Sequence, residues 1–331
     1  MMMPDTTDKP HLRVAVLIPC YQEELTIGKV VHDFRRQLPG ADVYVYDNNS
    51  TDRTGERAAE AGAIVRREKR QGKGFVVASM LEQVEADIYV FVDGDDTYHA
   101  PSVHALIAPV VTGEADMTVA SRSTDTEGKT FRRFHQFGNR MVCRVINLIF
   151  HSNIQDIFSG YRAMTRELAK TIPVVARGFD VETELTLQTL YRRFVIKEIA
   201  APYGFRPEGS ESKLRTIPDG LKVIFRVFLL LQSYKPLTLF GSAAILAFLC
   251  SLAAGYTPVK EYLEFRYVYS LPRAYLATGL SIISVLSAAV GIILHSVNFR
   301  LMEVEKMLSK RTPLQPTPNS RSQRSASGSP L

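Results

Sequence analysis

Three carboxylates stand within four residues in the stretch YVFVDGDDTYHAP, which runs from Tyr89 to Pro101. Asp93, Asp95 and Asp96 repel one another, and repulsion raises carboxyl pKa values unless a cation or hydrogen bonds offset it. Hard oxygen ligands suit Mg²⁺ or Mn²⁺, and Mg²⁺ typically completes its shell with phosphate oxygens. The stretch therefore predicts a divalent cation bound with a diphosphate. The alternative is a strand-end turn whose Asp side chains bind backbone amides.

Two further polar segments follow apolar runs and favour a nucleotide as the ligand. The segment IPCYQEE contains Pro19, Tyr21 and Glu23, an aromatic face and an acceptor of the kind that holds a base. The segment DNNSTD contains Asp47 and Asp52, candidates for a base or ribose contact. Each segment alone also fits an ordinary turn with helix capping. A dehydrogenase or a P-loop ATPase is not predicted, because no G-x-G-x-x-G follows a strand and GKGFVVAS lacks phosphate-loop spacing.

The elements that must position these segments lie between Arg13 and about Ser121. The runs RVAVLIP, VYVYD, AIVRR, IYVFVD and MTVAS are rich in β-branched and aromatic residues, which predicts strands. The stretches ELTIGKVVHDFRRQL, DRTGERAAEAG and GKGFVVASMLEQVEA between them have helical spacing. This alternation predicts an α/β fold, a mostly parallel sheet with helices on both faces. Ligands of such sheets bind beyond the carboxyl ends of the strands, where the polar segments fall.

The composition allows a sizeable folded domain and argues against a disulfide scaffold. The chain has 331 residues, 46% of them apolar, and a net charge of +6 that suits phosphate groups, anionic lipid or nucleic acid. Cys20, Cys143 and Cys250 lie far apart, so neither a disulfide framework nor a zinc site is predicted. The polar, acid-containing N-terminus predicts that the soluble part stays in the cytosol.

Two uncharged segments, over residues 237–256 and 274–297, are long enough to span a membrane. About 20 apolar residues cross a hydrocarbon core of about 30 Å. Two buried core helices are the alternative. The preceding stretch LKVIFRVFLLLQSYK mixes basic and apolar residues, which favours an interfacial helix over an amphipathic core helix. Six basic residues after the second span favour both ends in the cytoplasm.

The predicted organisation has five parts. They are an N-terminal tail over residues 1–12, a catalytic domain over 13–218, an interfacial amphipathic helix over 219–235, a two-helix transmembrane hairpin over 236–298, and a cytoplasmic tail over 299–331. The tail is rich in Pro, Ser and Gln from about residue 312, which predicts disorder there.

Eight segments, taken in order, carry a resemblance to a known family: IPCYQEE, YDNNSTDRT, QGKG, FVDGDD, ASR, DIFSGYRA, GFDVETEL and RPEGSESK. They look like the family 2 glycosyltransferases with a GT-A fold, which is a Rossmann-like sheet. Among these the chain is most similar to the polyprenyl-phosphate glycosyltransferases, such as dolichyl-phosphate mannose synthase and bacterial undecaprenyl-phosphate glucosyltransferases. The resemblance covers roughly Val14 to Lys213, and the two predicted spans fit the membrane-anchored branch.

The resemblance implies roles for individual residues. The family's nucleotide-binding positions are matched by Pro19, Tyr21, Glu23, Asp47, Lys73 and Asp93. Its D-x-D motif, which holds Mg²⁺ or Mn²⁺ on the donor diphosphate, is matched by Asp93 and Asp95. Further catalytic positions are matched by Arg122, a phosphate-contacting arginine, by Asp156 before SGYR, and by Glu182, the acid of the donor or acceptor pocket. Ser212 and Lys213 fall in a late loop beside the active site, where Lys213 is a candidate for binding the acceptor phosphate.

Two segments depart from the family's pattern. The usual DADLQHP has a Gln two residues after the second Asp, where this chain has Thr97, so the identity of a third metal ligand is open. The usual DDGSTD reads DNNSTD here, so that Asn48 replaces an acid and Asn49 replaces a glycine.

The implied reaction is attack by a lipid phosphate oxygen on the anomeric carbon of a nucleotide sugar, with inversion and release of the nucleoside diphosphate. The acceptor phosphate has a second pKa of about 6, so at neutral pH it is mostly a dianion and needs no strong general base. A metal at Asp95 and the cation of Arg122 would stabilise the leaving diphosphate. Arg132 and Arg133 are candidates for the acceptor phosphate, with solvated arginines as the alternative. Asp156 is a candidate for orienting these cations or the sugar hydroxyls.

The expected partners are a nucleotide sugar, membrane lipid and a polyprenyl phosphate, undecaprenyl or dolichyl. UDP-glucose is favoured over GDP-mannose and the bacterial inner membrane over other membranes, while a homo-oligomer is left open. A processive polysaccharide synthase is disfavoured, because it relies on a Q-x-x-R-W segment and the chain has no Trp. A degenerate scaffold would tolerate loss of the D-x-D pair, which is intact here. Nucleic acid is not an expected partner, because the basic residues are scattered or near the predicted membrane segments.

Overall fold

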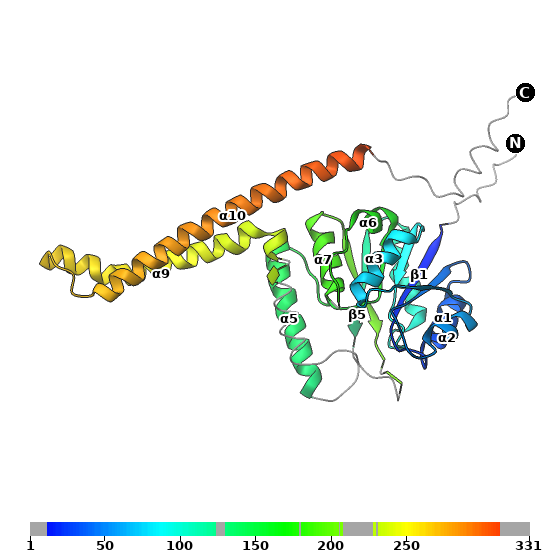
Figure 1. Ribbon diagram of the computed structural model, residues 1–331. Helices are drawn as coiled ribbons and strands as arrows, with labels where there is room; N and C mark the ends of the chain where they lie inside the picture. The colour runs from blue at the N-terminus through cyan, green and yellow to red at the C-terminus, as the bar shows by residue number, and fades with distance from the viewer. Residues whose placement is uncertain are drawn as a thin grey trace, which may run out of the picture. The chain divides into compact units, whose positions relative to one another are not determined.

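The computed structural model describes residues 12–123, 130–178, 180–204, 206–207, 228–229 and 231–311. The chain divides into two compact units, one of residues 1–224 with 314–331 and one of residues 225–313. The first unit is an α/β domain, and the second contains two long helices (Figure 1). The predicted disordered tail from residue 312 lies outside the described residues.

The first unit is built on a seven-stranded sheet with the strand order β3-β2-β1-β4-β6-β5-β7. Its strands are β1 (Val14–Cys20), β2 (Asp42–Asp47), β3 (Ile64–Arg67), β4 (Ile88–Phe91), β5 (Met117–Ser123), β6 (Arg162–Thr165) and β7 (Ile196–Pro202). β6 pairs antiparallel with β4 and β5, and the other pairs are parallel. The prediction of a mostly parallel sheet is therefore confirmed.

Helices cover both faces of this sheet (Figure 1), as the alternation of elements predicts. Val16 and Ile18 of β1 belong to one buried core with residues of α1 and α4, whereas Ala15 and Leu17 belong to a second core with residues of α3, α6 and α7. Successive side chains of a strand point to opposite faces, so a strand buried on both sides reads as a continuous apolar run. The helices are α1 (Ile27–Gln37), α2 (Thr54–Glu60), α3 (Lys73–Gln83), α4 (Val103–Val111) after the 3₁₀ turn η1 (Ala100–Ser102), α5 (Thr130–Phe150), α6 (Arg166–Thr171) and α7 (Val181–Tyr191).

β6 is a strand that the sequence pattern does not reveal. It has four residues, RAMT, and its first residue is an arginine with 1% exposure. The guanidinium of Arg162 donates to the carbonyl oxygens of Ser159 and Ile157 and to Oγ1 of Thr186. A buried charge is tolerated when its donors are satisfied in this way. These contacts join residues up to 24 positions apart, which local periodicity cannot show.

The second unit is a hairpin of α9 (Pro236–Phe265) and α10 (Leu271–Arg311), both long and apolar enough to cross a membrane. Only 6% and 11% of their most apolar windows are buried, which contradicts the alternative of two buried core helices. The Ser251 hydroxyl donates to the carbonyl of Ala277 at 2.7 Å, and the Ser284 hydroxyl to that of Ala244 at 2.8 Å. Such interhelical bonds satisfy polar groups without water.

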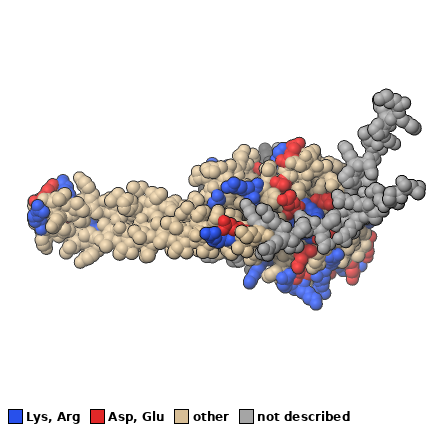
Figure 2. Space-filling model, turned by 90° about the horizontal axis from the view of Figure 1, so that it is seen from above, with Lys and Arg blue, Asp and Glu red and all other residues tan. Residues whose placement is uncertain are grey.

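Charged side chains gather at the connection between the two helices, and the visible face along the hairpin is mostly uncharged (Figure 2). Glu261 accepts hydrogen bonds from the backbone amides of Tyr269 and Ser270, both at 2.9 Å, which closes the connection. α9 itself ends at Phe265, beyond residue 256, where the predicted span ends. The predicted interfacial helix lies largely outside the described residues, although residues 228–229 and 231–234 are helical.

Candidate active site

Four acids from separate predicted segments come together at the carboxyl edge of the sheet. Cys20, the last residue of β1, pairs in register with Asp47, the last residue of β2. Burial, then the charges of Glu23, Asp47, Asp93 and Asp95, raises the pKa of the Cys20 thiol well above its usual value. The polar segments that follow β1, β2 and β4 therefore share one electronegative site, as the strand alternation predicts.

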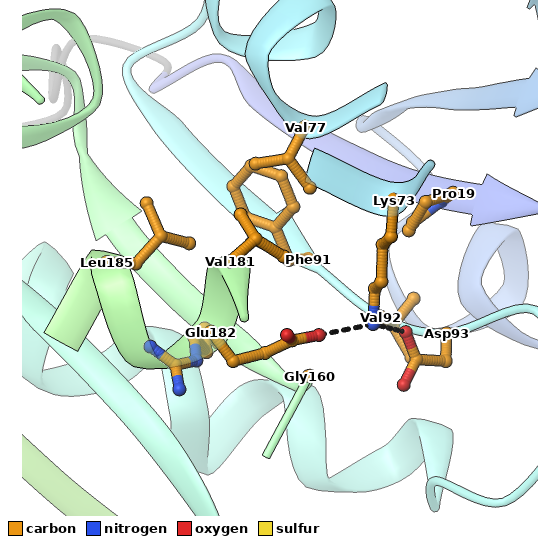
Figure 3. A pocket seen from close by; sticks show the side chains of 11 residues that line it. Pro19, Lys73, Val77, Phe91, Val92, Asp93, Gly160, Val181, Glu182 and Leu185 are labelled. Atoms are coloured by element: carbon orange, nitrogen blue, oxygen red, sulfur yellow. Dashed lines mark hydrogen bonds and ion pairs between the residues drawn. The ribbon is translucent and has the colours of Figure 1, made fainter. Parts of the chain in front are cut away.

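Lys73 is the cation that links two of the predicted site acids. Its ammonium lies 2.5 Å from Oδ1 of Asp93 and 2.5 Å from Oε1 of Glu182 (Figure 3). Burial opposes the charge on Lys73, but the two carboxylates outweigh burial and raise the pKa of the ammonium. Pro19 lies beside this cluster and lines the same small cavity. Lys73 thus bridges Asp93, which follows β4, and Glu182 on α7.

Two glycines permit this close packing. A Cβ on Gly74 would lie 2.0 Å from the carbonyl oxygen of Ala176, so only glycine lets the start of α3 approach the segment before α7. A Cβ on Gly160 would lie 2.6 Å from Oδ2 of Asp93. The segments QGKG and SGYR therefore place the backbone against the cluster of Lys73, Asp93 and Glu182.

Asp95 is almost completely buried, with 4% exposure. Its Oδ1 accepts hydrogen bonds from Oγ1 of Thr97 at 2.6 Å and from the Thr97 amide at 3.2 Å. Burial, followed by the charge of Asp93, raises the pKa of Asp95. Thr97, which stands where the family has Gln, thus orients the second acid of the D-x-D pair.

Arg206 is a site residue that the sequence analysis missed. Its Nη2 lies 2.5 Å from Oδ2 of Asp95, and its Nη1 lies 3.8 Å from Oε1 of Glu23. The amide of Gly204 donates to the carbonyl of Thr97 at 2.8 Å, which brings the chain after β7 beside the acids. Arg206 opens the quoted segment RPEGSESK, so the motif marked the region although it did not identify this residue.

Asp96 points away from this cluster. Its backbone is left-handed, with φ 58°, and its Oδ1 lies 2.6 Å from the ammonium of Lys29 on α1. Lys29 also lies 3.1 Å from Asp33, and its side chain is 62% exposed. The third acid of the stretch therefore attaches the loop to α1 rather than joining the other two.

A separate ion pair joins Arg122 and Asp156. Nε of Arg122 donates to Oδ2 of Asp156 at 2.6 Å and Nη2 donates to Oδ1 at 2.9 Å, a bidentate arrangement. Burial lowers the pKa of Arg122, but Asp156 outweighs burial and raises the pKa. The guanidinium also lies over the ring of Tyr203, 5.4 Å from its centroid. Asp156 thus orients Arg122, a partner that the sequence analysis did not assign to it.

The predicted nucleotide-binding segments contain one exposed side chain, Tyr21, and carboxylates that already have partners within the protein. Tyr21 is 38% exposed, whereas Glu23 is buried. Oδ1 of Asp47 accepts the amide of Ser50 at 3.0 Å. Asp52 accepts from the amides of Thr54 and Glu24, so its carboxylate holds the loops after β1 and β2 together.

The structure explains why DNNSTD has asparagines at positions 48 and 49. Nδ2 of Asn48 donates to the carbonyls of Glu68 and Arg70, and its Oδ1 accepts the amide of Gly72 at 2.7 Å. An aspartate could not make the two donor bonds. Asn49 has φ 63°, a left-handed conformation that asparagine adopts more readily than most residues.

Four predicted residues are not placed. Ser212 and Lys213 lie outside the described residues. Arg132 and Arg133 lie on α5, but their side chains are also outside the description. Their assignment to the late loop and to the acceptor phosphate stays a prediction.

The acids suit a divalent cation that shares its ligands with a substrate. Among the residues that the structure describes, no three His, Cys, Asp or Glu side chains form a complete metal site. Mg²⁺ commonly takes one or two carboxylates and fills its shell with phosphate oxygens. Asp93 and Asp95, two residues apart beyond β4, therefore fit a cation that arrives with a diphosphate.

An α/β sheet with acids and ion-paired cations at its carboxyl edge is the arrangement that the resemblance to GT-A glycosyltransferases implies. The pattern described as glycosyl transferase family 2 matches residues 15–172. Glycosyltransferase AglJ of Haloferax volcanii is 34% identical over 69% of this chain and 75% of its own length. The chain therefore belongs to glycosyltransferase family 2.

Two other similar proteins illustrate the range of this fold. The dolichol-phosphate mannosyltransferase of Pyrococcus furiosus is 28% identical over 65% of this chain and 64% of its own length. A structure of the glucosyl-3-phosphoglycerate synthase of Mycobacterium tuberculosis with Mn²⁺, UDP-glucose and phosphoglyceric acid matches with a TM-score of 0.55. It is 24% identical over 68% of this chain and 80% of that one, a likeness that shows the fold.

Proposed function

We propose that this glycosyltransferase moves a hexose from a nucleotide diphosphate sugar to a membrane polyprenyl phosphate with inversion at the anomeric carbon. UDP-glucose is the donor that we favour and GDP-mannose is the second choice. The observation that carries the proposal is the pair of neighbouring acids Asp93 and Asp95 at the carboxyl edge of the sheet, in a chain with two membrane-length helices. The similarity to the dolichol-phosphate mannosyltransferase supports a lipid phosphate as the acceptor.

In this proposal the acids at the sheet edge bind the metal, and the cations stabilise the charge of the leaving diphosphate. Asp93 and Asp95 would hold Mg²⁺ or Mn²⁺, which supplies positive charge to the leaving diphosphate. Arg122 adds a fixed guanidinium whose direction Asp156 sets through two hydrogen bonds. Preorganised charge of this kind stabilises the transition state without reorganisation.

Lys73 and Glu182 have a positioning role in this proposal. Glu182 has 6% exposure and faces Lys73, which also holds Asp93. The ammonium fixes both carboxylates where the donor sugar and diphosphate would meet. No side chain has to remove a proton, because an acceptor phosphate with a second pKa of about 6 is already mostly dianionic.

The test is transfer of labelled sugar by membranes that contain the full chain. A panel of UDP- and GDP-sugars is supplied with polyprenyl phosphate and Mg²⁺ or Mn²⁺, and the lipid-extractable label is counted. We expect one donor to dominate, and Asp95→Asn or excess chelator to abolish transfer. Transfer to water or to a soluble acceptor alone would refute the lipid acceptor, and no transfer from any donor would favour a scaffold.

A further inference from the structure

Arg206 takes a position that bears on metal binding. Its guanidinium lies between two acids that come from different strand ends, at 2.5 Å from Asp95 and 3.8 Å from Glu23. Both carboxylate side chains are at most 9% exposed, whereas that of Arg206 is 28% exposed. The partly exposed Arg206 guanidinium therefore lies against two buried carboxylates, those of Asp95 and Glu23.

The chain before Arg206 is attached to the loop that carries Asp95. Tyr203 forms an antiparallel bridge with Tyr98, and the Gly204 amide donates to the carbonyl of Thr97 at 2.8 Å. The rings of Tyr98 and Tyr203 also meet edge to face, with centroids 5.1 Å apart. Arg206 follows two residues after this attachment, so its closeness to Asp95 results from backbone contacts.

The oxygens of Asp95 are shared between two partners. Oδ1 accepts both hydrogen bonds from Thr97, and Oδ2 holds Arg206. Oδ2 of Asp95 makes neither of the Thr97 hydrogen bonds and is therefore the oxygen better suited to bind a metal. The Arg206 guanidinium contacts this same oxygen. A divalent cation on the same oxygen would lie close to a second positive charge, and like charges at short range repel strongly.

We propose that Arg206 is a built-in counter-ion that competes with the divalent cation for Asp95 and leaves Asp95 when the metal binds. This inference rests on the proposed metal role of Asp95. In the protein without metal, the guanidinium offsets the charge of buried acids that would otherwise repel one another. The same contact weakens binding of a metal alone, so that the cation binds well only when a diphosphate adds its own negative charge.

The experiment is a titration of the full-length protein in detergent with Mn²⁺ alone, with free Mn²⁺ followed by electron paramagnetic resonance. Arg206→Ala should bind Mn²⁺ about tenfold more tightly than the unchanged protein, because one nearby positive charge is removed. Arg206→Gln, which keeps most of the side chain, should give the same direction. A merely structural role would predict weaker binding in both variants.

Lys29→Ala is the matched control, because Lys29 is a second cation on the same acidic loop but pairs with Asp96. Its Mn²⁺ affinity should stay within about twofold of the unchanged protein. Equal gains in Lys29→Ala and Arg206→Ala would refute direct competition and leave only a general charge effect. Equal or weaker binding in both Arg206 variants would refute the proposal.

Asp95→Asn separates this inference from the proposed function. If Asp95→Asn abolishes Mn²⁺ binding while Arg206→Ala does not change it, the metal site stands and the competition is wrong. If neither the unchanged protein nor Arg206→Ala binds Mn²⁺ alone, the competition is wrong, and the same titration with a nucleoside diphosphate present decides the metal role of Asp95 separately.

Discussion

Asp95 and Asp96 are neighbours in the chain but belong to two different regions of the molecule. Asp95 is buried at the sheet edge, where Thr97 and Arg206 bind its two oxygens. Asp96 has a left-handed backbone and pairs with Lys29, whose side chain is 62% exposed. One acid of a run can thus be buried at the sheet edge while the next attaches the loop to a helix, because the backbone turns between them.

Asp95→Asn, at the buried acid, should have a greater effect than any other substitution considered for this loop. We expect sugar transfer to fall by about 1,000-fold, since the change removes a charge that holds the metal on the leaving group. Transfer of labelled sugar per mole of protein measures the loss. The thermal unfolding temperature should not fall, because burial raises the pKa of Asp95 and thus favours a neutral side chain at that position. Retention of more than about a tenth of the activity would contradict the role.

The next largest effect is expected from Lys73→Met. The substitution leaves Asp93 and Glu182 without their shared cation, and an uncompensated buried charge costs about 3 kcal/mol of unfolding free energy. Urea unfolding of the detergent-solubilised protein measures it. The double variant Lys73→Met with Glu182→Gln should recover part of the loss. A change of less than about 1 kcal/mol would show that the cluster tolerates its charges without Lys73.

Glu68 is a carboxylate next to the DNNSTD segment, because its backbone carbonyl accepts a hydrogen bond from Asn48. Hydrogen bonds from Arg70 lower the pKa of Glu68 to about 2. Burial opposes this shift, and a hydrogen bond from Ser79 adds to it. The folded value lies below the unfolded value of about 4.3, so the stabilisation is complete above that pH and is lost as the pH falls toward about 2.

Glu68→Gln should therefore cost about 1 kcal/mol at neutral pH, a value reduced because solvent surrounds the exposed Arg70. The gap in unfolding free energy between this variant and the unchanged protein should close between about pH 4.5 and 2. Urea unfolding at a series of pH values measures the gap. A gap that is constant down to pH 2 would mean that packing, not charge, explains the cost.

The smallest effect is expected from Lys29→Ala. Exposed ion pairs contribute about 0.5 kcal/mol or less, so unfolding should hardly change. Sugar transfer should stay within about twofold of the unchanged protein, as measured with the same labelled donor. A tenfold loss of transfer would contradict separate roles for the two acids, because Asp96 would then act together with Asp95.

Much of the sheet and its ligand edge could be predicted, because the information is local. β1, β2 and β4 are apolar runs that end in polar segments, and parallel strands bring such ends to one edge. The membrane-length helices are local in the same sense, since length and lack of charge identify them. These features need no knowledge of which residues meet across the fold.

The contacts that tune the site could not be predicted in this way. Lys73 and Glu182 are far apart in sequence, and their meeting depends on the approach that Gly74 permits. Arg206 reaches Asp95 through the pairing of the chain after β7 with the loop after β4. The sequence makes Asp156 a candidate for orienting other cations or the sugar hydroxyls, whereas its bidentate pair with Arg122 depends on the folded loop.

The α/β class, the acidic carboxyl edge of the sheet, the membrane-length helices and, through the ordered segments, the family can all be predicted from the sequence. Periodicity and strand-end composition encode these features within short windows. The ion-pair partners of the acids become visible only in the folded chain: Lys73 pairs with Asp93 and Glu182, Arg206 with Asp95, and Lys29 with Asp96. Electrostatic partners depend on distance in space and on burial, and neither is a property of local sequence.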